Sequence, residues 1–148
     1  MYIAIDPGKN VGVATFKDDG TDNSRKTFRE PFFLNFLELL VAAKPPEVVF
    51  IMEDFKLSKE KALDQVGSDM PAPRMIGAVQ MTSVILGSRS HIELVPPGHL
   101  RTSLKWAGYP ELAAKPRQWH CPDDISAYAH GVKYLIDRGI RIHPIFGK

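Results

Sequence analysis

Short apolar runs separated by turn residues open the chain and predict β-strands. Met1–Asp6 is a continuous apolar run that ends at an acid, and Val11–Phe16 is a second run in which larger and smaller residues alternate. Pro7–Asn10 predicts the turn between them. Asp18–Gly20 predicts another turn, toward a weaker third strand near Ser24–Phe28. Together these segments predict an antiparallel meander of three strands.

Helical and strand patterns alternate over the middle of the chain. Large apolar residues recur at helical spacing over Phe33–Ala43, and two prolines end this pattern before a buried strand over Val48–Glu53. The polar stretch Lys56–Pro73 predicts a long mobile loop. A helix over Arg74–Leu86 follows, and His91–Val95 predicts the last strand.

The clearest helical pattern begins at Asp123. Apolar residues from Ile125 to Ile136 follow helical spacing, with Pro122 before the pattern and Gly139 after it. The order of three strands, helix, strand, helix, strand and helix predicts an α/β fold, a mixed sheet flanked by helices. We expect residues 1–148 to form one domain, because 148 residues with 44% hydrophobic side chains suffice for one sizeable core.

Composition excludes several classes of protein. The longest apolar stretches are too short to span a bilayer and the start lacks a signal-peptide pattern, so we expect a soluble, cytoplasmic protein. Cys121 is the only cysteine, which excludes an internal disulfide and a cysteine-rich zinc site. The net charge of +2 does not indicate a nucleic-acid partner by itself. Residues 101–148, however, carry eight basic and four acidic side chains, as a phosphate-binding rim would require.

Acidic residues stand where three of these predicted elements begin or end. Asp6 and Glu53 end the buried runs Met1–Asp6 and Val48–Glu53, and Asp123 and Asp124 open the last helix. Acids are almost never fully buried without a partner, so an apolar run that ends in one indicates a site. If the first and fourth strands are neighbours, the acids converge. Several carboxylates together suit Mg²⁺ or Mn²⁺, and two such ions activate a water and stabilise the leaving oxygen of a phosphodiester.

Three sequence blocks resemble a known family. These are Ile5-Asp6-Pro7-Gly8 followed by Val11-Gly12-Val13-Ala14, then Met52-Glu53-Asp54-Phe55, and then His120 to His130. They resemble RuvC-type Holliday junction resolvases of the RNase H-like superfamily, particularly the compact versions in bacteriophages. The resemblance implies that Asp6 bridges two metal ions, that Glu53 binds one, and that the C-terminal acids complete the site. It also implies Mg²⁺ as cofactor, with Mn²⁺ able to substitute, and a bacterial or phage-infected host cell.

The C-terminal block leaves two assignments open. Family members with two acids three residues apart would need an acid at Ser126 or Ala127, whereas the His-x-x-Asp form is matched by His120 and Asp123. The apolar stripe of the helix argues instead for Asp124, because four residues before Tyr128 lies position 124. Resemblance therefore favours Asp123, with His120 as a ligand or a partner of the scissile phosphate, and helical geometry favours Asp124.

Each acid also has a simpler interpretation. Asp6 before Pro7 is a common turn residue, and Glu53 would be a strand-end acid paired with Lys56. Asp123 or Asp124 would offset the positive end of a helix dipole. The joint occurrence of the three blocks in order favours a site over these alternatives. His130 lies two turns after Asp123, but such a histidine is more often packed or solvated than a ligand.

These observations predict a Mg²⁺-dependent, structure-selective DNA endonuclease that resolves Holliday junctions, a crossover junction endodeoxyribonuclease. Two symmetric cuts need two active sites, so we expect a homodimer, with the helix from Arg74 and the aromatic C-terminal half as candidate interfaces. Trp106, Tyr109 and Trp119, near Lys105, Lys115 and Arg117, would stack on bases beside phosphate contacts, and core packing is the alternative for at least one of the tryptophans. Four basic residues are expected to contact phosphates: Lys56, Lys59, Lys61 and Arg74.

Other activities fit the same residues. A flap or branched-DNA nuclease, or an RNase H acting on hybrids, would use the same chemistry, because substrate shape alone separates these enzymes. A non-catalytic DNA-binding protein with this fold is a different class, but it would be marked by loss of Asp6 or Glu53, and both are present. A sugar kinase or actin-like ATPase needs a second domain, for which 148 residues leave no room.

Overall fold

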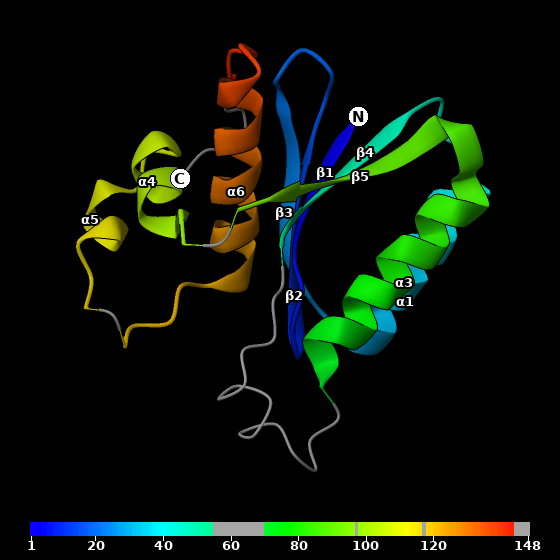
Figure 1. The fold of residues 1–148 in the computed structure, drawn as a ribbon, viewed down its shortest axis with the longest axis horizontal. Coiled ribbons are helices and arrows are strands. Elements are labelled where there is room, and N and C mark those ends of the chain that lie inside the picture. The colour runs from blue at the N-terminus through cyan, green and yellow to red at the C-terminus, as the bar shows by residue number, and fades with distance from the viewer. Residues whose placement is uncertain (55–69, 97, 117, 144–148) are drawn as a thin grey trace.

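A five-stranded mixed sheet forms the centre of the molecule in the computed structural model, which describes residues 1–54, 70–96, 98–116 and 118–143 (Figure 1). The strand order across the sheet is β3-β2-β1-β4-β5. The strands are β1 (Tyr2–Asp6), β2 (Asn10–Phe16), β3 (Asp22–Arg29), β4 (Val48–Glu53) and β5 (Ser90–Val95).

Strand β1 lies at the middle of the sheet and joins its two halves. It pairs antiparallel with β2, which pairs antiparallel with β3, so the predicted meander is confirmed. On its other side β1 pairs parallel with β4, and β4 pairs parallel with β5. Both faces of β1 and β4 are covered, which explains why their sequences are continuous apolar runs rather than alternating ones.

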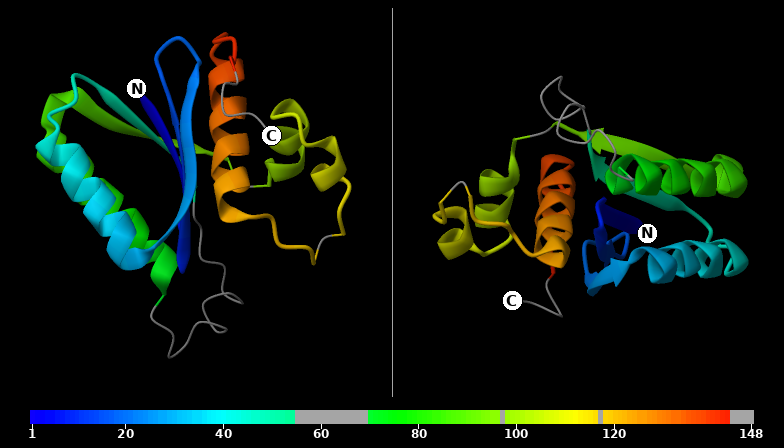
Figure 2. Two further views of the ribbon diagram at one scale, coloured as in Figure 1. Left: turned by 180° about the vertical axis from the view of Figure 1, so that it is seen from behind. Right: turned by 90° about the horizontal axis from the view of Figure 1, so that it is seen from below.

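Helices cover the two faces of the sheet in separate layers (Figures 1 and 2). On one face lie α1 (Glu30–Ala42) and α3 (Pro71–Leu86), which pack on Ile3, Ile5 and Phe50. On the other face lies α6 (Asp123–Asp137), which packs on Ala4 and Phe16, with two short helices outside it. These are α4 (Leu100–Trp106) and α5 (Pro110–Ala113).

Most predicted boundaries differ from the observed ones by one to three residues. Helix α3 starts at Pro71, so the loop predicted over Lys56–Pro73 is wrong at its end, because proline is well tolerated in the first turn of a helix. Residues 55–69 of that predicted loop lie outside the described residues. The short helices α4 and α5 and a 3₁₀ turn at Gly87–Arg89 were not predicted. Among the described helices, none has both the length and the apolar character needed to cross a membrane.

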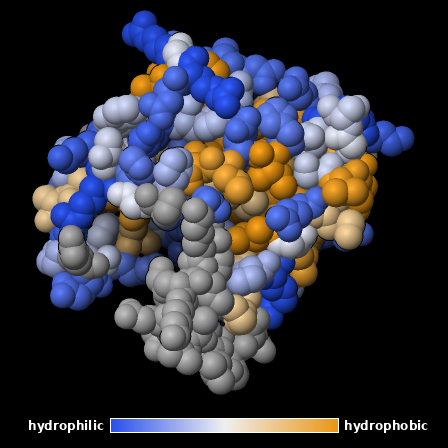
Figure 3. Space-filling model, in the orientation of Figure 1, coloured by the Kyte–Doolittle hydropathy of each residue, from blue (hydrophilic) through white to orange (hydrophobic). Residues whose placement is uncertain are grey.

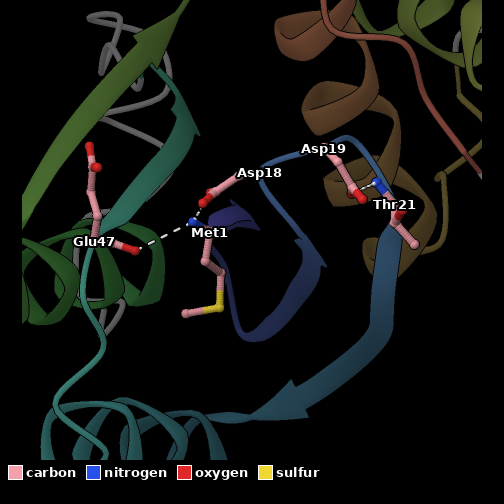
Figure 4. Close-up of polar contacts among 5 residues, drawn as sticks. All are labelled: Met1, Asp18, Asp19, Thr21 and Glu47. Atoms are coloured by element: carbon pink, nitrogen blue, oxygen red, sulfur yellow. Dashed lines mark hydrogen bonds and ion pairs between the residues drawn. The ribbon is translucent and has the colours of Figure 1, made fainter.

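Polar contacts hold the start of β1 beside the β2–β3 turn (Figure 4). The Met1 amino group pairs with the Asp18 carboxylate and donates to the Glu47 carbonyl oxygen at 3.4 Å. Within the turn, the Asp19 carboxylate accepts a hydrogen bond from the Thr21 N–H at 2.9 Å. The start of the central strand is thereby tied to both neighbouring segments.

Candidate active site

The first two predicted acids lie at one edge of the sheet. In the parallel pairing of β1 with β4, Ile5 is in register with Met52. The next residue in each strand is Asp6 and Glu53, respectively, and both stand at the carboxyl ends of their strands. The prediction that these strands are neighbours is confirmed, and the parallel register is what brings the two acids together.

Two glycines allow α6 to lie directly on the sheet beside these acids. Gly12 pairs with Asp6 across the β1–β2 ladder, and a Cβ at position 12 would lie 1.9 Å from the Asp123 carbonyl oxygen. Gly131, farther along α6, would place a Cβ 2.5 Å from the Phe16 ring and 3.0 Å from the Ala4 Cβ. A side chain at either position would push the helix off the sheet, so the two glycines set how closely Asp123 approaches Asp6.

One face of α6 presents three polar side chains to the two strand ends. Asp123, Ser126 and His130 are separated by three and four residues and therefore lie in one row on a helix. The Ser126 hydroxyl donates a hydrogen bond to the Asp6 carboxylate. The His130 Nε2 lies 3.4 Å from a Glu53 carboxylate oxygen, and the His130 side chain is only 5% exposed. Each strand-end acid thus has a partner on α6.

The surroundings of Asp6 disfavour the ionised form of its carboxyl. Burial raises the pKa of the Asp6 carboxyl above its usual value, and the negative charges of Asp123 and Glu53 raise it further. The Ser126 hydrogen bond and the nearby His130 lower the pKa of the same group, but they do not outweigh burial. A desolvated carboxylate beside two others is an arrangement that a bound cation would relieve.

The two adjacent acids of α6 point to different neighbours. Asp123 interacts with Asp6 and lies 3.4 Å from His120, measured from His120 Nε2 to Asp123 Oδ1. Asp124 instead pairs with Arg25 of β3, at 3.3 Å from Nε to Oδ2. Arg25 is itself held between the rings of Tyr109 and Tyr128. The structure therefore brings Asp123, rather than Asp124, to Asp6.

The residues before α6 differ strongly in exposure. The His120 side chain is 84% exposed, so apart from its contact with Asp123 it stands open to solvent. Cys121 is buried, as expected for a small filler residue, and burial together with Asp6, Asp124 and Asp123 raises the pKa of its thiol to about 11.

Of the four predicted DNA-contact residues, the structure describes only Arg74. Arg74 donates from its Nε to the Glu30 carboxylate at 2.8 Å, which links α3 to α1. Lys56, Lys59 and Lys61 lie outside the described residues. Tyr109 is buried and accepts a hydrogen bond from Arg25, so the prediction that it stacks on bases is wrong.

The two tryptophans lie in different surroundings. Trp106 is 45% exposed and has the Lys133 ammonium over its ring. Trp119 lines a pocket of about 340 Å³ together with Arg101 and Lys115, directly before His120. This pocket joins basic and aromatic groups next to the segment that leads into α6.

The donor chemistry of Asp6, Glu53 and Asp123 fits a hard divalent cation, because carboxylate oxygens are the ligands such ions prefer. In this structure, however, the three side chains lie farther apart than the ligands of a metal ion do. Within the described ranges, no group of three or more His, Cys, Asp or Glu side chains is close enough together to hold a metal ion. Glu53 is 37% exposed at its side chain, so its carboxylate is reachable from solvent.

Comparison with solved structures identifies the fold. Thermus thermophilus RuvC, in a structure described as a complex with a Holliday junction substrate, matches with a TM-score of 0.58 and 14% sequence identity, over 94% of this chain and 96% of that one. The chain has a RuvC-like fold. A second Thermus thermophilus RuvC structure matches with a TM-score of 0.48 and 16% identity over the same shares. No protein-family model matches the sequence, and no curated protein matches it either.

The RuvC-like architecture confirms the fold that the resemblance of the three sequence blocks implied. Several neighbours of the site were not predicted from sequence. Ser126 was considered only as a position lacking an acid, and Arg25 was not singled out, because a serine in a helix and an arginine in a strand carry no distinctive local signal. Gly12 was quoted within a motif, but its contact with Asp123 depends on the packing of α6.

Proposed function

We propose that this chain is a Mg²⁺-dependent, structure-selective DNA endonuclease that resolves four-way junctions as a homodimer. The observation that carries the proposal is the position of Asp6 and Glu53 at the ends of adjacent parallel strands, with Asp123 of α6 beside Asp6, in a RuvC-like fold. The matching RuvC structure is described as a complex with a Holliday junction, which supports a branched DNA as the substrate class.

The proposed chemistry is hydrolysis of a phosphodiester. Bound Mg²⁺ would supply positive charge to activate a water and to stabilise the leaving oxygen. We assign Asp6 as its main ligand, since the Asp6 carboxyl feels the charges of both Asp123 and Glu53. Glu53 and Asp123 would close the site from either side, and both are partly exposed, so a phosphate can reach them. We assign His120 to contact with the scissile phosphate, which its 84% exposure and its position beside Asp123 support.

The proposed DNA surface extends from the site over the side of α4 and α5. Arg101, Lys115 and Trp119 line the pocket next to His120, and they offer two cations and one aromatic ring to a nucleic acid strand. The uneven charge of the sequence agrees, since the basic excess lies in residues 101–148. Lys56, Lys59, Lys61 and Arg74 remain proposed phosphate contacts.

An exposed apolar surface supports the homodimer. Helix α3 carries no charged residue from Met75 to Leu86, yet Met81, Val84 and Ile85 are 61%, 73% and 59% exposed. Figure 3 shows apolar surface extending over the side of the molecule where β5 and α3 lie. A groove of about 340 Å³ between α1 and α3 continues it. Large exposed apolar patches mark interfaces. We assign this one to a second copy, because two symmetric cuts require two sites.

Cleavage assays on defined substrates test the proposal. A four-way junction, a flap, an RNA–DNA hybrid and a linear duplex are each incubated with the protein in Mg²⁺ and in EDTA. We expect paired, symmetric cuts in the junction in Mg²⁺ alone, and none with Asp6→Asn. Faster cleavage of the flap or the hybrid would assign one of those activities to the same site, and Mg²⁺-independent cleavage would refute the proposed chemistry.

A further inference from the structure

His130 is a buried histidine that the proposed reaction does not yet use. It lies on the face of α6 that meets the ends of β1 and β4, and its side chain is 5% exposed. A buried polar side chain needs a partner. Its Nε2 lies 3.4 Å from Oε2 of Glu53, a looser contact than a well-formed hydrogen bond. Glu53 is thus the acid that His130 is placed to orient.

We propose that His130 is a positioning residue that holds one carboxylate oxygen of Glu53, so that the other oxygen faces Asp6 and a bound divalent cation. This inference rests on the metal site of the proposed function and adds a residue to it. The contact of the His130 ring with a single Glu53 oxygen fixes the orientation of the whole carboxylate, because both oxygens belong to one planar group. Contacts of this kind are often long without the metal and substrate and shorten when these are bound.

Ser126 has the matching position relative to Asp6. Its hydroxyl donates to the Asp6 carboxylate, so both strand-end acids are oriented by side chains of one helix, four residues apart. The two acids come from neighbouring parallel strands, and the two donors come from neighbouring turns of α6. Movement of α6 would therefore reorient both acids together. A histidine that only filled space in the core would have no such effect on Glu53.

A small cavity beside His130 makes the proposal open to chemical rescue. The cavity has a volume of about 50 Å³ and is lined by Val95, Pro96, His99 and Tyr134, in addition to His130 itself. Both Pro96 and His99 are exposed, so the cavity lies near the surface. Removal of the imidazole in His130→Ala would enlarge it, and free imidazole could then enter from solvent and occupy the vacated position.

Metal titration of the protein without DNA provides the test, with Mg²⁺ affinity measured by calorimetry. Removing a group that orients a metal-binding side chain typically costs about 10–100-fold in metal affinity. We expect a loss of this size in His130→Ala and in His130→Leu. His130→Gln, which keeps an N–H donor, should retain affinity within a few fold of wild type. Added imidazole should restore binding in His130→Ala, and His99→Ala, on the same cavity wall, should bind normally.

Some results would overturn the role of His130 alone, and another would refute the whole metal site. If Asp6→Asn abolishes Mg²⁺ binding while His130→Leu binds normally, His130 plays no positioning role. Equal losses in His130→Gln and His130→Leu would exclude orientation through an N–H donor. If Asp6→Asn itself binds Mg²⁺ as wild type does, the proposed metal site is refuted. Thermal unfolding in EDTA shows which variants fold, and the Gln and Leu variants remain informative if the smaller alanine unfolds the protein.

Discussion

Gly12 of β2 lies against the backbone of Asp123, so closely that a Cβ at position 12 would stand 1.9 Å from the Asp123 carbonyl oxygen. No real Cβ contact is that short, and the obstructing atom belongs to the backbone rather than to a flexible side chain. The close approach of β2 to α6 therefore depends on the absence of a side chain at position 12. Because Gly12 also pairs with Asp6, one residue adjoins two members of the candidate site.

Gly12→Ala should displace the start of α6 and lower both stability and cleavage. Overpacking a close contact typically costs about 1–3 kcal/mol, and occasionally more. Thermal unfolding and junction cleavage measure the two effects. The stability control is Gly77→Ala on α3, where a Cβ meets nothing within 4 Å and the variant should be as stable as wild type or more so. Equal unfolding temperatures for Gly12→Ala and wild type would contradict the packing described for α6.

Asp6→Asn should abolish cleavage and, without metal, stabilise the protein at neutral pH. Because the folded-state pKa of Asp6 is raised, the folded state holds the proton more tightly than the unfolded state does. Its contribution to stability is therefore fully present below the usual value of 3.8 and is lost as the pH rises through the folded-state pKa. The asparagine variant avoids this loss, so the difference in unfolding temperature should grow from acid to neutral pH in EDTA.

The control for that experiment is Asp19→Asn. Hydrogen bonding by Thr21 lowers the pKa of Asp19, so removal of this charge should give no gain at neutral pH. A gain equal to that of Asp6→Asn would show that the effect comes from net charge rather than from burial at position 6.

Asp123→Asn should lose Mg²⁺ affinity, whereas Asp124→Asn should mainly lose the pair with Arg25. The Arg25–Asp124 contact is partly exposed, and such pairs contribute about 0–1 kcal/mol. Calorimetric titration with Mg²⁺ and thermal unfolding separate these two effects. If Asp124→Asn loses more metal affinity than Asp123→Asn, then Asp124 is the metal-binding acid and the arrangement described here changes when the cation binds.

Val84→Lys should convert the proposed dimer to a monomer. Val84 is 73% exposed on the uncharged face of α3, and a lysine there would place like charges at a self-complementary interface. Sedimentation measures the oligomeric state, and the symmetry of junction cuts reports its consequence. Thr102→Lys on α4 adds the same charge to the opposite layer and should leave the dimer intact. A monomeric wild-type protein at micromolar concentration would refute the assignment of this surface.

Cys121 should resist alkylation in the folded protein. With its thiol pKa raised to about 11, only about one molecule in a thousand carries the thiolate at pH 8. The native protein should therefore react slowly with iodoacetamide at pH 8, and protein unfolded in urea should react at the rate of an ordinary cysteine. Equal rates in the two states would show that the thiol is accessible and ionised in the fold.

Sequence alone predicted the sheet and the two strand-end acids, since both depend on strong local signals. Continuous apolar runs predict β1 and β4, and Asp6 and Glu53 are conspicuous because they end those runs. The short helices α4 and α5 were missed because four to seven residues give too little periodicity to detect.

The choice between Asp123 and Asp124 could not be made from sequence for a different reason. Both acids lie in the first turn of α6, and the apolar stripe alone placed Asp124 toward the sheet. The structure shows that facing the sheet is not equivalent to facing Asp6, because Asp124 meets Arg25 of β3 instead. Arg25 acts from 99 positions earlier in the chain, a pairing that no local pattern reveals. The roles of these acids in metal binding stay predictions.

The docking of α6 onto β2 through Gly12 and Gly131 also determines when the candidate site can exist during synthesis. Asp6 and Glu53 emerge early from the ribosome, but Asp123, Ser126 and His130 belong to a helix made much later. Contacts between segments so far apart in sequence cannot form until the later segment is available. A nascent chain that ends before position 123 thus carries two of the three acids and lacks the third, so the proposed nuclease activity cannot begin before α6 has been made and docked.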